Sequence, residues 1–381
     1  KKEGITMQAS YYRPTRITVD LSAIKENIEL HKQKLALGQS VFAVVKADAY
    51  GHGVLPVAKA AIEAGAVGFC VATLDEALEL RTNGFLEPII VLGPIDYEGL
   101  KLASEYEISI PVVDLDYLDG LIAKVQTLSL SKPLLLHLAI DSGMSRIGIR
   151  TKEELHQAEA KISAHSDLLF EGIFTHFSTA DKEDDSYFKQ QISMFKALLG
   201  SLSQQPKYVH VENSATTLWH ETLGNIVRLG ISMYGLNPSG KALESPITLC
   251  PALSLTSALT QVKFVEKGTG IGYGKTYVAQ QDEWIGTVPI GYADGFIRKY
   301  QGYQVLVNGQ LCEIVGRVCM DQMMIRLPEQ VALGSKVTIV GRDGQQERTL
   351  QDMADYVDTI HYEVACLLSP RIPRVYIEEK R

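Results

Sequence analysis

Residues 40–53 read Ser-Val-Phe-Ala-Val-Val-Lys-Ala-Asp-Ala-Tyr-Gly-His-Gly, and this stretch decides the fold. Its first part, Val41–Val45, is a short apolar run rich in β-branched residues. Such a run predicts a strand that is buried on both faces, as the strands of parallel sheets are. Lys46 follows directly, and Gly51 and Gly53 then loosen the backbone before a helical pattern begins. A lysine at the carboxyl end of a parallel strand lies on the face where α/β folds build their sites.

Two interpretations of Lys46 remain open on this stretch alone. In the first, burial removes water from the ammonium group and favours the free amine, which can form a Schiff base. In the second, Lys46 is an ordinary solvated lysine at a strand end. The rest of the chain has to decide between them.

The pattern around this stretch repeats along the first two thirds of the chain. Strand-like apolar runs occur at residues 41–45, 67–72, 89–92, 110–113, 134–140, 171–175, 208–211 and 226–229. Stretches with helical spacing lie between most of them, at residues 54–64, 74–83, 117–125, 152–162 and 185–202. Eight strand–helix repeats predict an α/β fold with a closed (β/α)8 barrel of the TIM type. The alternative, an open doubly wound sheet, needs G-x-G-x-x-G after the first strand, and Lys46 is followed by no such motif.

The hydrophobic pattern of the sequence changes after Pro251, where short segments of alternating polar and apolar residues replace the strand–helix repeat. The turn signals Asn308-Gly309 and Asp343-Gly344 separate several of these segments, as in hairpins. We therefore expect a tail or tag at residues 1–10, the barrel at residues 11–250, and a mostly β C-terminal domain at residues 251–381. Residues 15–21 alternate like a strand with one exposed face, and residues 253–265 read as a single strand-like segment.

Composition excludes several classes of partner. The formal net charge is −8 and no basic run stands out, which argues against nucleic acid and anionic membranes. No apolar stretch is long enough to span a membrane. The five cysteines form neither a C-x-x-C pair nor a metal-ligand spacing, so we expect a reducing compartment, a cytoplasmic location and no metal site.

Charged and polar groups follow five of the expected strands. Barrel sites are assembled from the loops at the carboxyl ends of the strands, so these groups should gather on one face. Each of them alone has an ordinary explanation, as a strand-end cation or a core histidine. The groups are Lys46, Arg146, His176, His210 and Arg228.

The loops after the last two strands suit a phosphate group. Asn213 and Ser214 precede a short helical stretch, and Gly230 with Ile231 lets the backbone approach an anion closely. Barrels typically hold phosphates at this place. The plainer interpretation is a helix cap followed by a turn.

Several motifs occur in one order along nearly the whole chain. They are Val44–Gly53, Thr175–Asp181, Asn213-Ser214, Arg228–Gly235, Gly272-Tyr273-Gly274, Gly291–Phe296, Gly316–Asp321 and Tyr362-Glu363. In sequence and order these motifs resemble the alanine racemases. The resemblance implies an N-terminal (β/α)8 barrel, a C-terminal β domain, and a head-to-tail homodimer in which the barrel of one subunit faces the β domain of the other.

The resemblance also assigns roles. It implies pyridoxal 5'-phosphate as cofactor, Lys46 as the Schiff-base lysine and one catalytic base, and Tyr273 from the other subunit as the opposite base. Arg228 would meet the pyridine nitrogen, with His210 supporting it. The implied cofactor-binding residues are Lys46, Tyr50, Arg146, His176, Asn213, Ser214, Arg228, Gly230, Ile231 and Tyr362. Arg146 and Met320 would bind the substrate, and His210, Tyr292, Asp181, Arg298 and Arg317 would support the site or line its entrance.

The implied activity is the two-base interconversion of L-alanine and D-alanine, which supplies D-alanine for peptidoglycan precursors. A serine or broad-specificity amino-acid racemase is the alternative, although the bulk of Tyr362 would crowd a larger side chain. Decarboxylation on a related fold would require an acidic partner for the pyridine nitrogen, where this chain has Arg228. A cofactor-carrying barrel without catalysis would lack the second domain that holds Tyr273 and Met320.

One position departs from the family pattern. Many relatives carry a lysine, carbamylated in some, seven residues before the arginine that matches Arg146, and this chain has Ala139 there. The negative charge that would hold Arg146 is therefore missing. We expect a small anion such as chloride, or a water molecule, to fill the gap.

Residues 268–276 could be mistaken for a nucleotide-binding loop, because they contain four glycines. A P-loop needs glycine where Thr269 stands, and G-x-G-x-x-G needs glycine where Tyr273 or Lys275 stands. Both patterns fail. The remaining interpretation is a flexible hairpin turn that presents the phenol of Tyr273.

Overall fold

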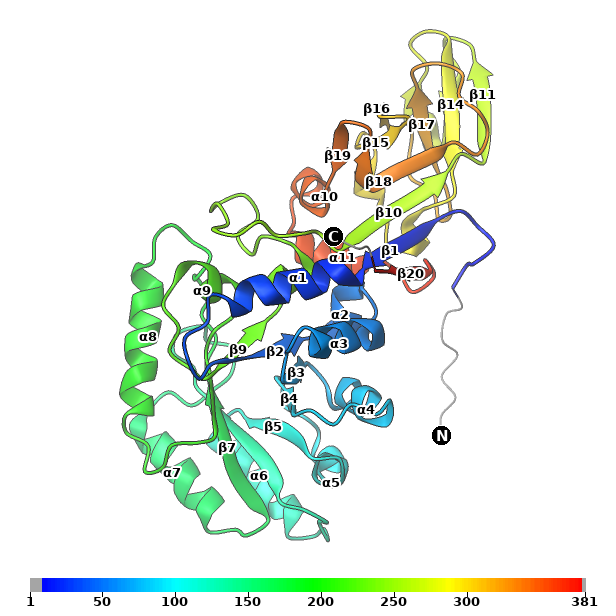
Figure 1. Cartoon of the computed structure of the whole chain (residues 1–381). Coiled ribbons are helices and arrows are strands. Elements are labelled where there is room, and N and C mark those ends of the chain that lie inside the picture. The colour runs from blue at the N-terminus through cyan, green and yellow to red at the C-terminus, as the bar shows by residue number, and fades with distance from the viewer. Residues whose placement is uncertain (1–8, 379–381) are drawn as a thin grey trace. The chain divides into compact units, whose positions relative to one another are not determined.

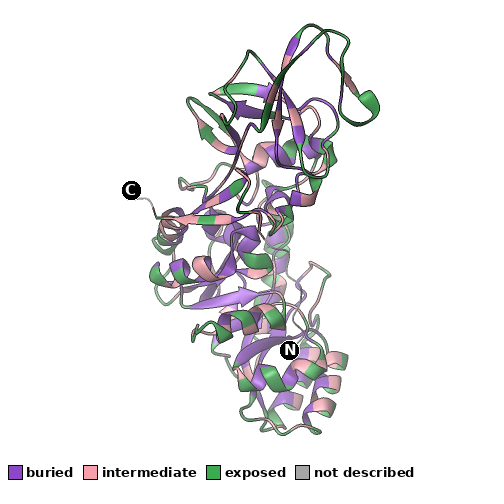
Figure 2. Ribbon diagram, turned by 90° about the vertical axis from the view of Figure 1, so that its right-hand side faces the viewer, coloured by how far each residue is buried: buried purple, intermediate pink, exposed green. Residues whose placement is uncertain are grey.

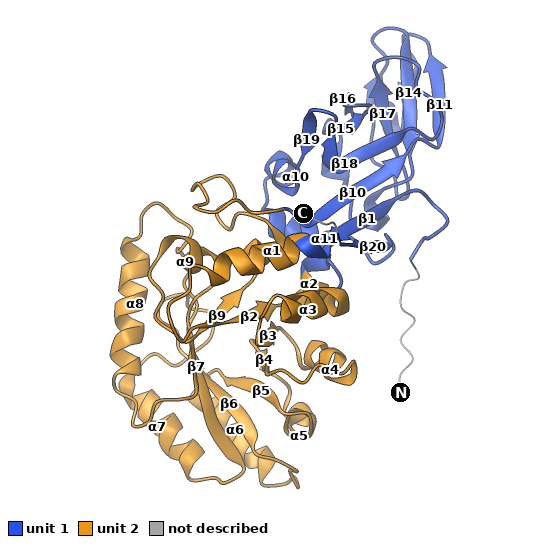
Figure 3. Ribbon diagram, in the orientation of Figure 1, with its two compact units in different colours: residues 1–22, 50–53, 251–381 blue, residues 23–49, 54–250 orange. Residues whose placement is uncertain are grey.

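The computed structural model describes residues 9–378, so the expected tail at residues 1–10 lies outside this range except for Ala9 and Ser10. The chain forms two compact units, which Figure 3 distinguishes by colour. The barrel unit comprises residues 23–49 and 54–250. The β unit comprises residues up to 22, residues 50–53, and residues from 251 onward.

The barrel unit contains the eight expected strands, all paired in parallel. Their order in the sheet is β8-β7-β6-β5-β4-β3-β2-β9, and a parallel bridge between Glu212 and Val227 joins the two ends. The predicted (β/α)8 barrel is confirmed. The strands are β2 (Ser40–Val44), β3 (Gly68–Val71), β4 (Ile89–Val91), β5 (Ile108–Val112), β6 (Leu134–Ala139), β7 (Leu168–Phe174), β8 (Tyr208–His210) and β9 (Ile226–Leu229).

Helices connect these strands, as Figure 1 shows in blue through green. Thr73 with Glu76 and Thr151 with Glu154 form capping boxes, which satisfy the first amide groups of α4 and α7. The helices predicted from spacing are present, and the short α5 is an addition to them. The helices are α1 (Leu21–Lys32), α3 (Val54–Glu63), α4 (Leu74–Thr82), α5 (Leu100–Glu105), α6 (Leu115–Val125), α7 (Lys152–Ser163), α8 (Ser186–Leu199) and α9 (Ser214–Trp219).

The β unit is built from one seven-stranded sheet, one three-stranded sheet and one two-stranded sheet. Its strands and helices agree with the mostly β domain predicted after Pro251. Its elements are β1 (Arg16–Asp20), β10 (Leu253–Ala258), β11 (Gln261–Val265), β12 (Gly270–Ile271), β13 (Tyr277–Val278), β14 (Glu283–Val288), β15 (Gln304–Val307), β16 (Gln310–Glu313), β17 (Met323–Leu327), β18 (Lys336–Asp343), β19 (Gln346–Arg348), β20 (Arg374–Ile377), α10 (Leu350–Val357) and α11 (His361–Leu367).

The structure differs from the expected boundaries at the start of the chain. We counted residues 11–22 with the barrel, but β1 pairs antiparallel with β10 and parallel with β20. Its apolar side chains Ile17 and Val19 are fully buried in this sheet. The pairing partners come from remote parts of the chain, so local spacing could predict the strand but not its sheet.

Two further details of the β unit bear on the sequence-based expectations. Residues 253–265 form two strands in different sheets, β10 and β11, rather than one continuous segment. Asn308 and Gly309 both have positive φ, 51° and 75°, and join β15 to β16. This geometry is the two-residue hairpin that an Asn-Gly pair favours.

Buried residues are concentrated on the barrel strands and on the inner faces of their helices, as Figure 2 shows in purple. Strands β3, β4 and β5 are buried along their entire length. Within residues 9–378, no helix is long and apolar enough to cross a membrane.

Burial of His31 predicts a pH-dependent loss of stability. His31 lies on α1, neither of its ring nitrogens is hydrogen-bonded to any of residues 9–378, and burial together with Lys34 lowers its pKa to about 4. Between pH 6.5 and 4 the unfolded chain binds a proton at this residue and the folded chain does not. We therefore expect the free energy of unfolding to fall, by on the order of 3 kcal/mol from this group, as pH drops through that window.

Urea denaturation at pH 7 and pH 4.5 would measure this effect. His31→Leu should make stability less dependent on pH, whereas His156→Leu, at an exposed histidine, should not. Equal pH dependence in wild type and His31→Leu would contradict the prediction.

Candidate active site

Lys46 begins a short helix, α2 (Lys46–Gly51), whose backbone is left-handed. Four consecutive residues without a glycine, Ala47 to Tyr50, have φ between 51° and 54°. Each such residue costs roughly 1–2 kcal/mol relative to the right-handed form, and backbone strain of this kind concentrates at functional sites.

Side chains of the barrel unit hold this turn. The amide of Ala47 donates to Glu76 Oε1 at 2.7 Å, and the amide of Val54 donates to Asp48 Oδ1 at 2.7 Å. Glu76 also caps α4, so the strained turn is tied to a regular helix. Lys46 thus leaves its strand in a defined direction, which the sequence alone did not indicate.

Arg228 on β9 lies at the centre of the strand-end cluster. Its guanidinium donates to His210 Nδ1 at 3.0 Å, to His176 Nδ1 at 3.3 Å and to the carbonyl oxygen of Thr175 at 2.9 Å. It also donates to the carbonyl oxygen of His210. The structure therefore brings together three of the five groups predicted at the strand ends.

The remaining two groups add positive charge to the same place. Loss of water, followed in order of effect by the charges of Arg228, Arg146 and Lys46, lowers the pKa of His176 to about 3. Within residues 9–378, no hydrogen bond or ion pair joins Arg146 or Arg228 to a carboxylate. Two arginines that make no ion pair with a described carboxylate suit an anionic ligand.

The loops after β8 and β9 form the expected cradle. Ser214 Oγ accepts hydrogen bonds from the amides of Gly230 at 3.0 Å and Ser232 at 3.3 Å. Both lone pairs are then used, so the hydroxyl proton of Ser214 remains to donate to a ligand. Ser232 Oγ is buried and has no hydrogen-bond partner among the described residues. These unused donors, beside Ile231, fit a phosphate group.

Asn213 has the plainer role that we had considered for this segment. Its Oδ1 accepts from the amide of Thr216 at 3.0 Å, which makes it the N-cap of α9. Its side-chain amide donates to the carbonyl oxygen of Phe177 at 3.4 Å. Asn213 therefore positions Ser214.

The β unit contains a second group of predicted site residues, beginning with a pair of tyrosines. Tyr50 and Tyr362, the latter on α11, lie with their ring centroids 6.2 Å apart. Their spacing in sequence exceeds 300 residues, and the structure nevertheless makes them neighbours.

Tyr273 stands at the tip of the β12–β13 hairpin, and 70% of its surface is exposed. Gly272 and Gly274 on either side both have positive φ, 73° and 72°. A strand follows this turn instead of the helix that a P-loop requires, so the hairpin interpretation is confirmed. The hairpin rests on an apolar cluster of Val265, Ile271, Ala279, Ile285 and Val315.

Arg317 lies against the Tyr273 turn, and backbone hydrogen bonds join the segments that carry Met320 and Tyr292. A Cβ atom on Gly274 would lie 3.1 Å from the guanidinium of Arg317, so that arginine lies directly against the Tyr273 turn. The amide of Ala293 donates to the carbonyl oxygen of Met320 at 3.0 Å, and the amide of Tyr292 donates to that of Cys319 at 3.0 Å. Met320 and Tyr292 are 53% and 41% exposed.

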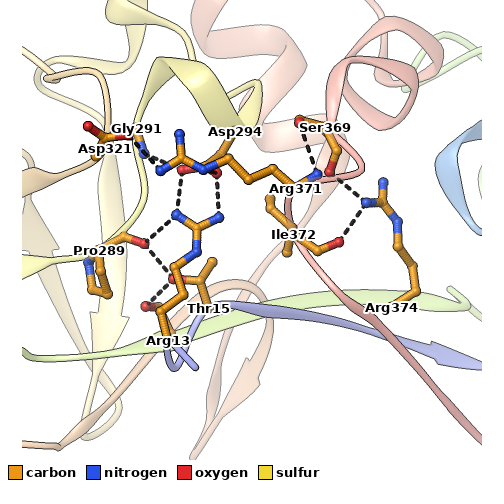
Figure 4. A network of polar contacts seen from close by, with 11 residues as sticks. Arg13, Thr15, Pro289, Gly291, Asp294, Asp321, Ser369, Arg371, Ile372 and Arg374 are labelled. Atoms are coloured by element: carbon orange, nitrogen blue, oxygen red, sulfur yellow. Dashed lines mark hydrogen bonds and ion pairs between the residues drawn. The ribbon is translucent and has the colours of Figure 1, made fainter. Parts of the chain in front are cut away.

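A network of charges fixes the turn that carries Tyr292, as Figure 4 shows. The buried carboxylate of Asp294 accepts hydrogen bonds from the guanidinium of Arg13 and from the amide of Gly291. Arg371 lies 3.5 Å from the same carboxylate and also pairs with Asp321 at 2.6 Å. Two arginines on one fully buried carboxylate give the turn a single conformation.

Two predicted entrance residues lie apart from these groups of contacts. Asp181 follows His176 in the loop between β7 and α8 of the barrel unit. Arg298 begins a short 3-10 helix, Arg298–Tyr300, and is exposed. Among the described residues, no hydrogen bond or ion pair joins either side chain to the other site residues.

The prediction omitted two residues, His137 on β6 and Glu171 on β7. His137 Nδ1 lies 2.8 Å from His210 Nε2, and His137 Nε2 lies 3.0 Å from Glu171 Oε2. Both residues interrupt otherwise apolar strands. A polar side chain in such a run could have been recognised as a buried, partnered group.

A small cavity occupies the place of the missing lysine. Its volume is about 20 Å³, and its lining includes Ala139, Asp141, Arg146, Thr175 and His176. A cavity of this size can hold one water molecule or small ion. Asp141 Oδ1 is already engaged with the amides of Gly143 and Ser145.

Comparisons with known proteins agree with this architecture. The family model described as "Alanine racemase, N-terminal domain" matches residues 19–238, and "Alanine racemase, C-terminal domain" matches residues 252–376. An alanine racemase of Levilactobacillus brevis is 53% identical over 371 residues, covering 97% of this chain and 100% of that protein.

Solved structures give the same result. The crystal structure of alanine racemase from E. faecalis has a TM-score of 0.95 at 53% identity and covers 97% of this chain and 100% of that chain. A histidine racemase from Leuconostoc mesenteroides subsp. sake has a TM-score of 0.91 at 35% identity, covering 97% and 100%. An N-terminal barrel followed by a β domain, with TM-scores above 0.9 to two racemases, defines a racemase fold. The chain belongs to the alanine racemase family.

The cavity beside Ala139 generates a prediction. Because Arg146 has no carboxylate partner among the described residues, we expect an anion in the cavity. Crystals grown in bromide should show an anomalous difference peak next to Arg146. Ala139→Glu, which brings its own carboxylate, should abolish the peak. A map in which a carboxylate of the wild-type protein holds Arg146 would contradict the prediction.

Proposed function

We propose that this chain is an enzyme that interconverts L-alanine and D-alanine. The observation that carries the proposal is the match to alanine racemases at about half identity over nearly the full chain. The product would be D-alanine for peptidoglycan precursors. Among the described residues the five cysteines form no disulfide, which is compatible with the cytoplasmic location expected from the sequence.

We further propose that the barrel unit holds pyridoxal 5'-phosphate. The donor set of the barrel unit fits it: Ser214, Gly230 and Ile231 would receive the phosphate. His176 would lie against the ring, and Arg146 would position the cofactor oxygen and the substrate carboxylate. The cofactor supplies an electron sink that stabilises negative charge at the α-carbon of the substrate.

Racemisation needs two bases, because a proton leaves one face of the α-carbon and another arrives at the opposite face. Lys46 would hold the cofactor and move the proton on one face. Tyr273 would serve the other face and come from a second copy of the chain. The exposure of Tyr273, Tyr292 and Met320 in the single chain supports a homodimer with shared sites, in which the β unit completes the partner's site.

The substrate assignment rests on the relatives and on Tyr362. Its ring beside Tyr50 would leave little room for a side chain larger than a methyl group. The histidine racemase among the structural neighbours shows that this fold accommodates a larger substrate at 35% identity. A serine or broad-specificity racemase is therefore the second candidate, with Arg146 and Met320 retaining their roles at the carboxylate.

The direct test is to incubate the protein with pyridoxal phosphate and L-alanine and to follow D-alanine by optical rotation, alongside an absorbance scan for lysine-bound cofactor. Lys46→Ala should lose both signals. Tyr273→Phe should keep the absorbance and lower racemisation by on the order of 10²- to 10⁴-fold.

Tyr277→Phe is the matched control, because Tyr277 lies on the same hairpin and donates to Glu283. It should remain active. Turnover of L-serine with none of L-alanine would favour the second candidate, and full activity of Tyr273→Phe would remove the two-base assignment.

The presence of an arginine at position 228 predicts that racemisation proceeds with little transamination. Arginine has no acceptor, so it cannot share a proton with the pyridine nitrogen, and the electron sink stays weak. Arg228→Glu should protonate that nitrogen, prolong the life of the negative charge at the α-carbon and increase pyruvate formation from alanine. Lactate dehydrogenase would measure the pyruvate. Arg228→Gln should produce less than Arg228→Glu, and unchanged pyruvate in Arg228→Glu would defeat the idea.

A further inference from the structure

A continuous line of hydrogen bonds runs through the interior of the barrel. Ser109 Oγ donates to Glu171 Oε2 at 2.6 Å, and the same oxygen lies 3.0 Å from His137 Nε2. His137 Nδ1 lies 2.8 Å from His210 Nε2, and His210 Nδ1 lies 3.0 Å from Arg228 Nη1. All five residues are buried, and they come from five strands, β5 to β9.

The two ends of this line cannot exchange roles. Glu171 is ionised, because hydrogen bonds from His137 and Ser109 and the charge of Lys207 outweigh burial and lower its pKa. An ionised carboxylate only accepts hydrogen bonds, and a guanidinium only donates them. The line therefore begins with an acceptor at Glu171 and ends with a donor at Arg228.

These ends determine where each histidine carries its proton. His137 must donate from Nε2 to Glu171, and His210 must accept at Nδ1 from Arg228. The bond between the two rings then requires His210 to donate from Nε2 to the bare Nδ1 of His137. Both rings are thus neutral with the proton on Nε2, which agrees with burial lowering the pKa of each.

A doubly protonated His137 is not compatible with the hydrogen bond from Arg228 to His210. If His137 were protonated on both nitrogens, His210 would have to accept at Nε2 and carry its proton on Nδ1. That proton would face the Arg228 guanidinium at 3.0 Å, placing two donors against each other. Ring packing also restricts rotation, since Tyr208 stacks on His137 and Phe174 stacks on His210.

We propose that Glu171 and His137 are positioning residues for Arg228: through His210 they hold the guanidinium as a donor, in one orientation, at the cofactor's ring. The proposal rests on the proposed function in its last step only, because the proton positions follow from the protein alone. The carboxylate whose charge acts on Arg228 directly is Glu212, whereas Glu171 acts on the guanidinium only through the direction of the hydrogen bonds between them.

The outer end of the line is arranged to keep Glu171 charged. Its second oxygen, Oε1, lies 3.8 Å from the ammonium group of Lys207. Glu171, Ser109 and Lys207 also line an open hollow of about 420 Å³. The Glu171 end of the line therefore meets a cation and borders a hollow, although its side chain is buried like that of Arg228.

Nitrogen-15 NMR of the histidine-labelled holoenzyme tests the proton positions, since the chemical shift of each ring nitrogen reports whether it carries a proton. His137→Gln and His210→Gln identify the signals by their loss. We expect both residues to carry a proton on Nε2 and none on Nδ1 at neutral pH. A protonated Nδ1 on either ring, alone or in a doubly protonated ring, would overturn the proposal.

Two substitutions at residue 137 test the effect on Arg228. Glutamine can donate to Glu171 and accept from His210, so His137→Gln should retain the absorbance of the bound cofactor. Leucine can do neither, so His137→Leu should shift that absorbance and weaken cofactor binding by on the order of tenfold. If His137 only filled space, glutamine and leucine at this position should have similar effects on the absorbance and on cofactor binding.

His31→Leu is the control for loss of a buried histidine, because His31 lies in the same unit and outside this line. Equal spectra and affinities in the glutamine and leucine variants would refute the positioning role, even if the proton positions were as expected. The NMR measurement needs no leucine variant to fold. It also separates the two proposals, since an enzyme inactive on alanine with both protons on Nε2 would refute only the function.

Discussion

The buried guanidinium of Arg228 is the constraint on which the rest of the barrel site depends. A cation that has lost its water has to be stabilised, and the usual solution is an adjacent carboxylate. Here the nearest hydrogen-bond partners are two neutral histidines and two carbonyl oxygens. The charge is therefore balanced partly from a distance, and the site keeps a surplus of positive charge that suits an anionic cofactor and a carboxylate substrate.

The same constraint explains the protonation of the surrounding groups. His176 is buried, and it lies among Arg228, Arg146 and Lys46, so both the loss of water and the three neighbouring charges disfavour a charged ring and its pKa falls to about 3. The family resemblance implies a negative charge where this chain has Ala139, and we expect an external group in the cavity beside Arg146 instead. In the β unit, by contrast, buried charge is balanced by a direct ion pair. The carboxylate of Asp294 pairs with two arginines there, and this makes the Tyr292 turn rigid.

Sequence patterns predicted the barrel because its strands are continuous apolar runs bounded by polar loops, and each run is a local feature. The strand-end residues followed from the rule that sites lie at the carboxyl ends of strands. The left-handed turn after Lys46 was not predicted, because no local preference favours four residues of that conformation outside glycine. His137 and Glu171 were missed because a polar residue inside a strand acquires its meaning only from partners on other strands.

The sequence by itself determined the family, the barrel, and the identity of the groups available for chemistry, since all of these are carried by local motifs and their order. Only the tertiary structure decided which strands β1 joins, that Tyr50 lies beside Tyr362, and that Glu171 reaches Arg228 through two imidazole rings. The reason is physical: hydrogen-bond direction and charge compensation depend on distances between residues that are far apart in the chain, and no local pattern encodes those distances.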